Sequence, residues 1–182
     1  MINIIGGKYR SRLLDTPEEG TLPTKNMVRG AMASSISTYI PGARVLDLYA
    51  GSGALGLEML SRGAASCLFV DMGKGAYKVI CGNVAKLKEA NCTVWNLEDK
   101  KALEKAKGLG MQFDIVFLDP PYALKESYQY DVDFLRENGM LSDNAVLILE
   151  YEGELPFDSS AFPFRREYRY GKTKVLLLKV EA

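Results

Sequence analysis

The chain has 182 residues, of which 47% are hydrophobic and 25% are charged, as expected of a globular domain with a small appendage. Its formal net charge is zero, which excludes overall electrostatic attraction of nucleic acid, so any such binding must come from local basic patches. It contains no histidine, which excludes Ser-His-Asp catalysis, histidine general bases and histidine-ligated zinc.

The composition also bears on the compartment. No apolar run approaches the roughly 20 residues that span a bilayer, and the first residues lack the apolar core of a secretory signal. Cys67, Cys81 and Cys92 are scattered and odd in number, which favours neither a disulfide framework nor a metal pair. We expect a cytoplasmic protein, with neither a membrane nor a metal among its partners.

The N-terminal residues differ from the rest of the chain. The segments INII and SRLL flank Gly6-Gly7 and predict two short strands in a hairpin. Thr24 can cap a helix that Pro41-Gly42 ends, with one apolar stripe formed by Val28, Met32, Ile36 and Ile40. Residues 1–40 are therefore predicted to form an appendage.

From Arg44 onward, strand and helix patterns alternate. The expected strands are RVLDLY, SCLFVD, CTVWN, FDIVFLD and AVLILEY. The expected helices are Ala54–Arg62, Lys74–Ala90, Asp99–Lys107 and Lys125–Asn138. This alternation predicts a parallel sheet covered on both faces, and REYRY with TKVLLLKV predicts an antiparallel closing hairpin. Residues 41–182 are thus a Rossmann-like, doubly wound α/β domain, whose ligands bind beyond the carboxyl ends of the strands.

A glycine loop follows the first of these strands. VLDLYAGSGALG contains Gly51, Gly53 and Gly56 in the pattern G-x-G-x-x-G, between a strand and a helix. This context favours a bound nucleoside cofactor over a tight turn without a ligand. Asp71, twenty residues after Gly51, is placed to accept hydrogen bonds from ribose hydroxyls, which both NAD and S-adenosylmethionine carry.

An acid inside the strand before the loop discriminates between these cofactors. Beside a pyrophosphate Asp47 would add like-charge repulsion, whereas the ammonium and sulfonium of S-adenosylmethionine would stabilise it. The alternative is an Asp47 bonded to backbone N–H groups of its own turn. Met72 could pack on the adenine, and Glu98 or Asp99 could accept from its amino group, although acids also favour helix starts.

The second motif is DPPY, Asp119 to Tyr122, at the end of the fourth strand. Two prolines stiffen the segment. The Asp119 carboxylate and the Pro120 carbonyl can accept the two N–H groups of an amino group on a planar base, which turns its lone pair toward a methyl donor. Tyr122 offers a face for base stacking, worth roughly 1–3 kcal/mol. In a doubly wound sheet this corner lies beside the glycine loop; the alternative is a plain strand terminator.

Together these motifs resemble class I S-adenosylmethionine-dependent methyltransferases of amino nitrogens. The stretches IIGGKYRSRLL, PTKNMVRGAM, VLDLYAGSGALGLEMLSRGA, FVD, FDIVFLDPPY and YGKTKVLLL narrow the resemblance to bacterial RsmD-like 16S ribosomal RNA guanine-N2 methyltransferases, over nearly the whole chain. The resemblance implies methyl transfer to the N2 amino group of one guanine in small-subunit rRNA, and a role of the N-terminal hairpin in recognising RNA. Neutral net charge favours a target presented in an assembled small-subunit particle.

The candidate residues follow from both lines of reasoning. The expected cofactor contacts are Thr24, Asp47, Tyr49, Ala50, Gly51, Ser52, Gly53, Asp71, Met72, Glu98 and Asp99. The expected catalytic residues are Asp119, Pro120, Pro121 and Tyr122. The expected RNA contacts are Lys8, Arg10, Arg12 and Arg29, while the basic residues between Arg165 and Lys174 are equally consistent with a solvated strand face.

The chain departs from the family pattern near its first helix. Leu22 replaces the usual arginine, Asn26 replaces an acid, and Gly30 stands where glutamate is common. Gly30 costs the helix roughly 0.5–1 kcal/mol relative to alanine. These changes leave methyl transfer intact and bear on the target nucleotide. Three rival functions stay open: adenine-N6 methylation of DNA or RNA, an NAD-dependent oxidoreductase, and a non-catalytic rRNA-binding assembly factor.

Overall fold

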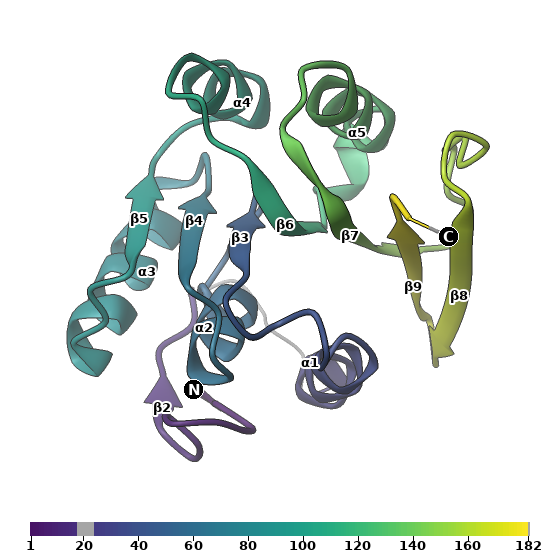
Figure 1. The fold of residues 1–182 in the computed structure, drawn as a ribbon. Helices are drawn as coiled ribbons and strands as arrows, with labels where there is room; N and C mark the ends of the chain where they lie inside the picture. Colours follow the sequence, from purple (N-terminus) through teal and green to yellow (C-terminus); the bar gives the residue numbers. More distant parts are fainter. Residues whose placement is uncertain (18–23, 182) are drawn as a thin grey trace.

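The computed structural model describes residues 1–17 and 24–181 and has three layers (Figure 1). A seven-stranded sheet lies between two helix layers, with α4 and α5 on one face and α1, α2 and α3 on the other. In the described part of the chain, no helix is both long and apolar enough to span a bilayer.

The strand order shows a doubly wound sheet. The strands are β3 (Arg44–Asp47), β4 (Ser66–Val70), β5 (Cys92–Trp95), β6 (Phe113–Leu118), β7 (Leu141–Glu152), β8 (Phe164–Tyr170) and β9 (Thr173–Lys179). They lie in the order β5-β4-β3-β6-β7-β9-β8. Neighbouring strands from β5 to β7 in this spatial order pair in parallel, and β9 pairs antiparallel with both β7 and β8. The predicted parallel sheet and its antiparallel closing hairpin are confirmed, with the switch point between β3 and β6.

The helices agree with the sequence pattern except at the ends of the first and third; the third was predicted to reach Ala90 but ends at Leu87, where Lys88 takes a left-handed conformation with φ +53°. The helices are α1 (Thr24–Ser35), α2 (Ala54–Ser61), α3 (Lys74–Leu87), α4 (Asp99–Gly108) and α5 (Ser127–Glu137), with a short 3₁₀ helix η1 (Tyr122–Leu124). The prediction that the first helix runs to Pro41 was wrong, because it ends at Ser35. The Ser35 hydroxyl donates to the Met32 carbonyl at 2.7 Å, and such bonding competes with helix continuation. Ile36 and Ile40 are nevertheless buried.

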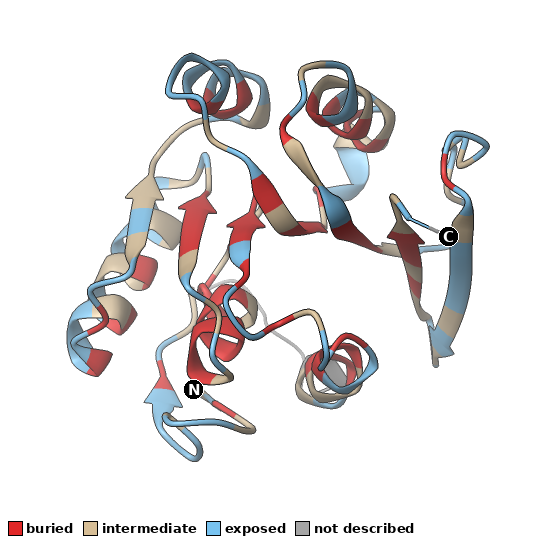
Figure 2. Ribbon diagram, in the orientation of Figure 1, coloured by how far each residue is buried: buried red, intermediate tan, exposed pale blue. Residues whose placement is uncertain are grey.

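Alternate residues of each central strand supply two separate cores. The central strands and α2 carry many of the buried residues (Figure 2). Val45 on β3 and Ile115 on β6 pack under α1, α2 and α3, whereas their neighbours Leu46 and Val116 pack under α4 and α5. Each central strand is therefore apolar on both faces, which explains its continuous hydrophobic run.

The N-terminal hairpin is confirmed, as β1 (Ile2–Asn3) paired antiparallel with β2 (Leu13–Leu14). It is anchored to α2 by the buried carboxylate of Glu58. This carboxylate accepts the backbone N–H groups of Ile5 and Gly6, each at 3.0 Å. It also pairs with Arg29 at 3.2 Å and with Arg62 at 2.9 Å. One buried acid thus joins the hairpin, α1 and α2, and two cations with two N–H donors satisfy it.

Close backbone approach completes this attachment. Gly7 has φ +79°, and a Cβ there would lie 2.0 Å from the Ser61 carbonyl oxygen, so only glycine fits. Next to it, the Lys8 N–H donates to that carbonyl at 2.8 Å. A Cβ at Gly30 on α1 would lie 3.2 Å from the Ile5 side chain. The glycine that departs from the family pattern therefore lets the hairpin segment pack closely on α1.

We expect Glu58→Gln to lower the free energy of unfolding by about 3–5 kcal/mol, because the buried Arg29 guanidinium loses its counter-charge. Urea denaturation followed by circular dichroism measures the change. Arg62→Gln is the matched control, because Arg62 is partly exposed and its loss should cost about 1 kcal/mol or less. Equal, small effects of both variants would contradict the anchoring role of Glu58.

Candidate functional site

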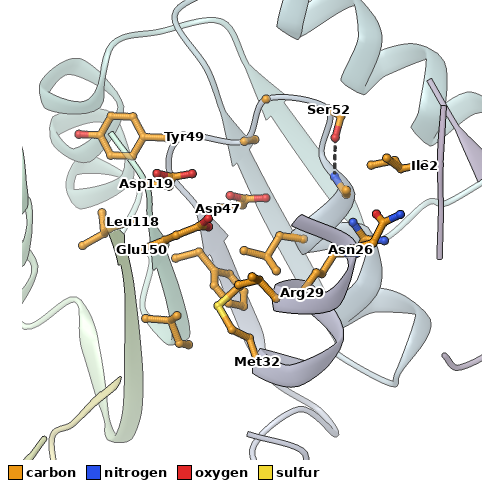
Figure 3. Close-up of a pocket in the computed structure, with 17 residues that line it drawn as sticks. Ile2, Asn26, Arg29, Met32, Asp47, Tyr49, Ser52, Leu118, Asp119 and Glu150 are labelled. Carbon is orange, nitrogen blue, oxygen red and sulfur yellow. Dashed lines mark hydrogen bonds between the residues drawn. The ribbon is translucent and has the colours of Figure 1, made fainter. Parts of the chain in front are cut away.

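A cavity opens at the carboxyl ends of β3 and β6, beside α1 (Figure 3). Three parts of the chain form it: the N-terminal segment and α1, the loop from β3 into α2, and the ends of β6 and β7. Its lining residues are Ile2, Asn26, Val28, Arg29, Met32, Asp47, Tyr49, Ala50, Gly51, Ser52, Ala54, Leu55, Phe117, Leu118, Asp119, Ile148 and Glu150. The position is the one expected for ligands of a doubly wound sheet.

The three glycines of the loop differ in what surrounds them. Gly51 has φ +59° and open space where a Cβ would point, so a ligand can approach its backbone. Gly53 has φ +80°, and a Cβ there would lie 3.3 Å from Ile80. At Gly56 a Cβ would lie 2.4 Å from the Phe69 ring, so glycine lets α2 pack on β4. The loop is shaped for a ligand only at its first glycine.

Asp47 lies at the base of the cavity and is buried. Its carboxylate accepts the Gly56 N–H at 3.2 Å, so the bond to the following turn, which the sequence offered as the alternative to a cofactor contact, is present. Burial raises the pKa of Asp47 to about 7, the Gly56 bond opposes this, and the charges of Asp71 and Asp119 add to it. A cation bound in the cavity would favour the ionised form.

Asp71 shapes the loop from outside the cavity. Its two carboxylate oxygens accept the N–H groups of Gly51 and Gly73, each at 2.9 Å. Its backbone carbonyl accepts from the Asn96 amide at 2.9 Å. The carboxylate keeps further lone pairs that could serve a ribose. Met72, beside it, is 60% exposed.

The acid at the start of α4 belongs to a buried cluster. The Tyr49 hydroxyl donates to Asp99 at 3.0 Å and also contacts Asp131 on α5. Burial, followed by the neighbouring Asp99, raises the pKa of Asp131 to about 9. Asp131 is therefore mostly protonated at neutral pH. Tyr49 is thus fixed at the cavity wall by two acids, one from α4 and one from α5.

A second cavity adjoins the first at the DPPY corner. It is lined by Asp119, Pro120, Tyr122, Lys125, Tyr128, Glu150, Tyr151, Glu152, Glu154 and Thr173. Asp119 and Glu150 line both cavities. Tyr122 is 78% exposed, with the Lys125 ammonium 4.0 Å from its ring centroid. Asp119, Pro120 and Tyr122 therefore line the second cavity, and Asp119 lies where the two cavities meet.

Some of the predicted site residues line the two cavities, and others do not. The first cavity brings together Asp47, Tyr49, Ala50, Gly51, Ser52 and Asp119. Neither cavity is lined by Gly53, Asp71, Met72, Glu98, Asp99 or Pro121. Leu22 and the side chain of Thr24 lie outside the described residues. The cofactor and catalytic roles of all these residues stay predictions.

Sequence reasoning missed two polar residues of the first cavity. Glu150 follows the apolar run of β7, and an acid at the carboxyl end of a buried strand is the signal that singled out Asp47. Asn26 on α1 also lines the cavity, and its buried amide oxygen has no hydrogen-bond partner. A buried acceptor without a partner is costly, which favours a ligand that donates to it.

The residues predicted to contact RNA separate into two kinds. Lys8, Arg10 and Arg12 lie on the exposed hairpin, although Lys8 pairs with Glu89 at 3.5 Å and Arg12 donates to the Lys86 carbonyl at 3.1 Å. Arg29 is only 5% exposed, and its guanidinium binds Glu58 and the Asn3 carbonyl. Arg29 therefore holds the hairpin and does not face solvent, contrary to its predicted place on an RNA surface.

Buried acceptors at the base of a glycine-loop cavity fit a nucleoside that carries positive charge. Asp47 and the amide oxygen of Asn26 supply two of them. Among residues 1–17 and 24–181, no group of three or more acids or cysteines could hold a metal ion. In this strand order, the site defines an S-adenosylmethionine-dependent methyltransferase with a Rossmann-like domain.

The chain belongs to the family described as Conserved hypothetical protein 95, whose model matches residues 2–179, and which is the RsmD family of the sequence resemblance. It is 35% identical to "Ribosomal RNA small subunit methyltransferase D" of Escherichia coli, over 100% of this chain and 91% of that protein. It is 32% identical to "Putative rRNA methyltransferase YlbH" of Bacillus subtilis, over 98% of each. The solved structure "Putative methyltransferase yhhF" from Escherichia coli superposes with a TM-score of 0.85 and 36% identity, covering 100% and 98% of the two chains.

The raised pKa of Asp47 predicts how stability depends on pH without cofactor. The folded state binds this proton more tightly, with a pKa of about 7 against an ordinary 3.8. Asp47 therefore contributes fully to the free energy of unfolding below about pH 4. This contribution falls as the pH rises and is lost above about pH 7. A shift of this size corresponds to on the order of 4 kcal/mol. Asp47→Asn should remove about 4 kcal/mol of the fall between pH 4 and 8 and keep the separate fall that comes from the raised pKa of Asp131, as measured by urea denaturation.

Asp114→Asn is the control for this experiment. Burial raises the pKa of Asp114, but bonds from Arg44 outweigh it and hold the pKa at about 2. Its stabilisation is therefore complete above about pH 4, and the variant should lose the same amount at every pH from 4 to 8. If the free energies of unfolding of wild type and Asp47→Asn change in parallel from pH 4 to 8, the raised pKa of Asp47 is refuted.

Proposed function

We propose that this protein transfers a methyl group from S-adenosylmethionine to the exocyclic N2 amino group of a guanine in small-subunit ribosomal RNA. The observation that carries the proposal is the position of Asp119, which lines both cavities. A methyl donor on one side and an amine on the other would meet at this carboxylate. The names of the relatives in Escherichia coli and Bacillus subtilis support ribosomal RNA as the substrate class.

The first cavity suits the cofactor. S-adenosylmethionine supplies a methyl group on a positively charged sulfur. Asp47 and the Asn26 amide oxygen would accept from its ammonium group, and the open backbone at Gly51 would border the nucleoside. Asp71 would accept from the ribose while it continues to hold the loop. A pyrophosphate would instead meet the charges of Asp47 and Asp119, which disfavours the NAD-dependent rival.

The second cavity suits the amino group of a base. Asp119 and the Pro120 carbonyl would accept its two N–H groups and turn the nitrogen lone pair toward the methyl. The bound donor would supply the methyl group: the new N–C bond would form as the C–S bond breaks, and the electron pair of that bond would stay on sulfur. The nitrogen then loses one proton, for which Asp119 is the nearby acceptor. Alignment of nitrogen, methyl and sulfur supplies much of the acceleration, so no histidine is required.

The acids at the boundary favour guanine over adenine. Guanine presents two neighbouring donors, N1–H and the N2 amino group, whereas adenine presents an acceptor at N1 beside its N6 amino group. Asp119 and Glu150 can accept from the N2 amino group and N1–H, respectively. A carboxylate facing the adenine N1 would instead be repelled. This pairing supports guanine-N2 methylation over its adenine-N6 rival.

Deletion of the gene should remove one N2-methylguanine from small-subunit rRNA, as mapped by mass spectrometry of nuclease fragments. The wild-type gene should restore it, and Asp119→Ala should not. In vitro, we expect Asp119→Ala to lower kcat by roughly 100-fold or more, because it removes the proton acceptor. Binding of S-adenosylhomocysteine, measured by calorimetry, should change little. Unchanged modification of rRNA in the deletion strain would remove the rRNA assignment.

The guanine preference has its own test, with 2-aminopurine at the mapped target position of a synthetic RNA. This base keeps the N2 amino group but has an acceptor at N1. Wild type should prefer guanine in kcat/KM. Glu150→Gln should reduce the preference about tenfold, because the amide can donate to the N1 of 2-aminopurine; such contacts are worth roughly 1–3 kcal/mol.

Glu152→Gln is the matched control, since Glu152 is exposed and lines only the second cavity. It should leave the ratio of kcat/KM values unchanged. A Glu150→Gln enzyme with the wild-type ratio would show that Glu150 does not read N1.

A further inference from the structure

The closing β-hairpin carries a basic groove that the proposed reaction does not use. Four cations line it, Arg165, Arg166, Arg169 and Lys174, against two carboxylates, Glu154 and Glu167. The remaining lining residues are Tyr151, Gly153, Leu155, Phe157, Ser159 and Leu176. We call this the C-terminal groove. It carries an excess of positive charge on a chain whose net charge is zero.

Hydrogen bonds and one ion pair hold the basic side chains of the C-terminal groove. Arg165 donates to the Ser159 hydroxyl at 3.2 Å, and Lys174 donates to the Gly153 carbonyl at 2.9 Å. Both bonds are to neutral groups, so they neutralise neither charge. Arg169 pairs with Glu167 at 3.2 Å, but its side chain is 70% exposed. These arginines and this lysine can therefore still bind phosphates.

The second cavity borders the C-terminal groove and has the opposite charge. The two share Tyr151 and Glu154. The second cavity is lined by four acids, Asp119, Glu150, Glu152 and Glu154, against the single cation Lys125. An uncharged base with N–H donors suits such a space, but a phosphate is repelled from it. The phosphates of a nucleotide whose base enters the second cavity must therefore lie outside it, and the adjoining cations of the groove are placed to receive them.

We propose that the C-terminal groove binds the sugar-phosphate backbone of RNA beside the target nucleotide. This inference rests on the proposed function, because it takes the second cavity as the site of the base. Lys8, Arg10 and Arg12 line neither that cavity nor the groove. The β8–β9 hairpin, not the N-terminal one, therefore positions the RNA next to the reaction.

The test compares Arg165→Glu/Arg169→Glu with wild type, both as the full chain. Methyl transfer is measured on small ribosomal subunits from a strain that lacks the gene, over a series of KCl concentrations. We expect KM to rise about tenfold or more and kcat to stay within about twofold, because binding is lost and the reacting groups are intact. The slope of log affinity against log salt should fall by roughly 1–2, about 0.7 per phosphate contact on a single strand.

Lys105→Glu/Lys107→Glu on α4 makes the same change in charge away from both cavities and the groove, and should match wild type. Thermal melting confirms that both double variants fold. A second measurement, fluorescence anisotropy with a labelled single-stranded RNA of about 20 nucleotides, does not depend on methyl transfer.

The two proposals fail in different ways. If wild type methylates the subunits and the groove variant matches it in KM and salt slope, the groove inference is overturned and the proposed function stands. If wild type binds RNA through the groove but methylates no small-subunit RNA, the groove inference stands and the proposed function fails. Equal losses in both double variants would show a general charge effect and would also overturn the groove inference.

Discussion

The parallel pairing of β3 with β6 is the constraint on which the rest of the site depends. Asp47 lies opposite Phe117, so Asp119 follows two residues beyond that pair, beside the start of the glycine loop. Because side chains alternate along a strand, a slip of one residue would turn Asp47 from the cavity to the opposite face. The two apolar cores oppose such a slip, since each strand packs alternate residues against both helix layers. Packing far from the cavity thus fixes the relative position of its two acids.

The acids and the cations of this molecule lie in different places, although its net charge is zero. Acids gather where the strands end, at Asp47, Asp119 and Glu150; burial raises the pKa of Asp47, and the charges of Asp71 and Asp119 add to this. Cations gather on the closing hairpin at the sheet edge. A net charge of zero therefore conceals one space suited to a cationic cofactor, another suited to an N–H-rich base, and a surface suited to phosphates. The chemistry of the proposed substrate follows this division.

The N-terminal segment illustrates the limit of reading charge along the chain. The hairpin itself was predictable from two apolar runs around a glycine pair. The role of Arg29 was not, because an arginine in an amphipathic helix has the same sequence pattern whether it faces solvent or a buried partner. Its partner Glu58 lies 29 residues away on α2, and only packing brings them together. The same packing explains Gly30, which lies against Ile5, and it brings Asn26 to the cavity wall.

By itself the sequence determined the order of strands and helices, the closing hairpin, the glycine loop and the acid–proline corner, because each depends on local periodicity and turn chemistry. The tertiary structure alone decided which of these face each other. It brought Glu150 between the two cavities, placed Asp71 behind the loop, and buried the Asp131 that holds Tyr49. Such contacts join residues far apart in the chain, and a carboxylate has the same local pattern whether it binds a ligand or its own backbone. Burial and distance in three dimensions, which no local pattern encodes, separate the two cases.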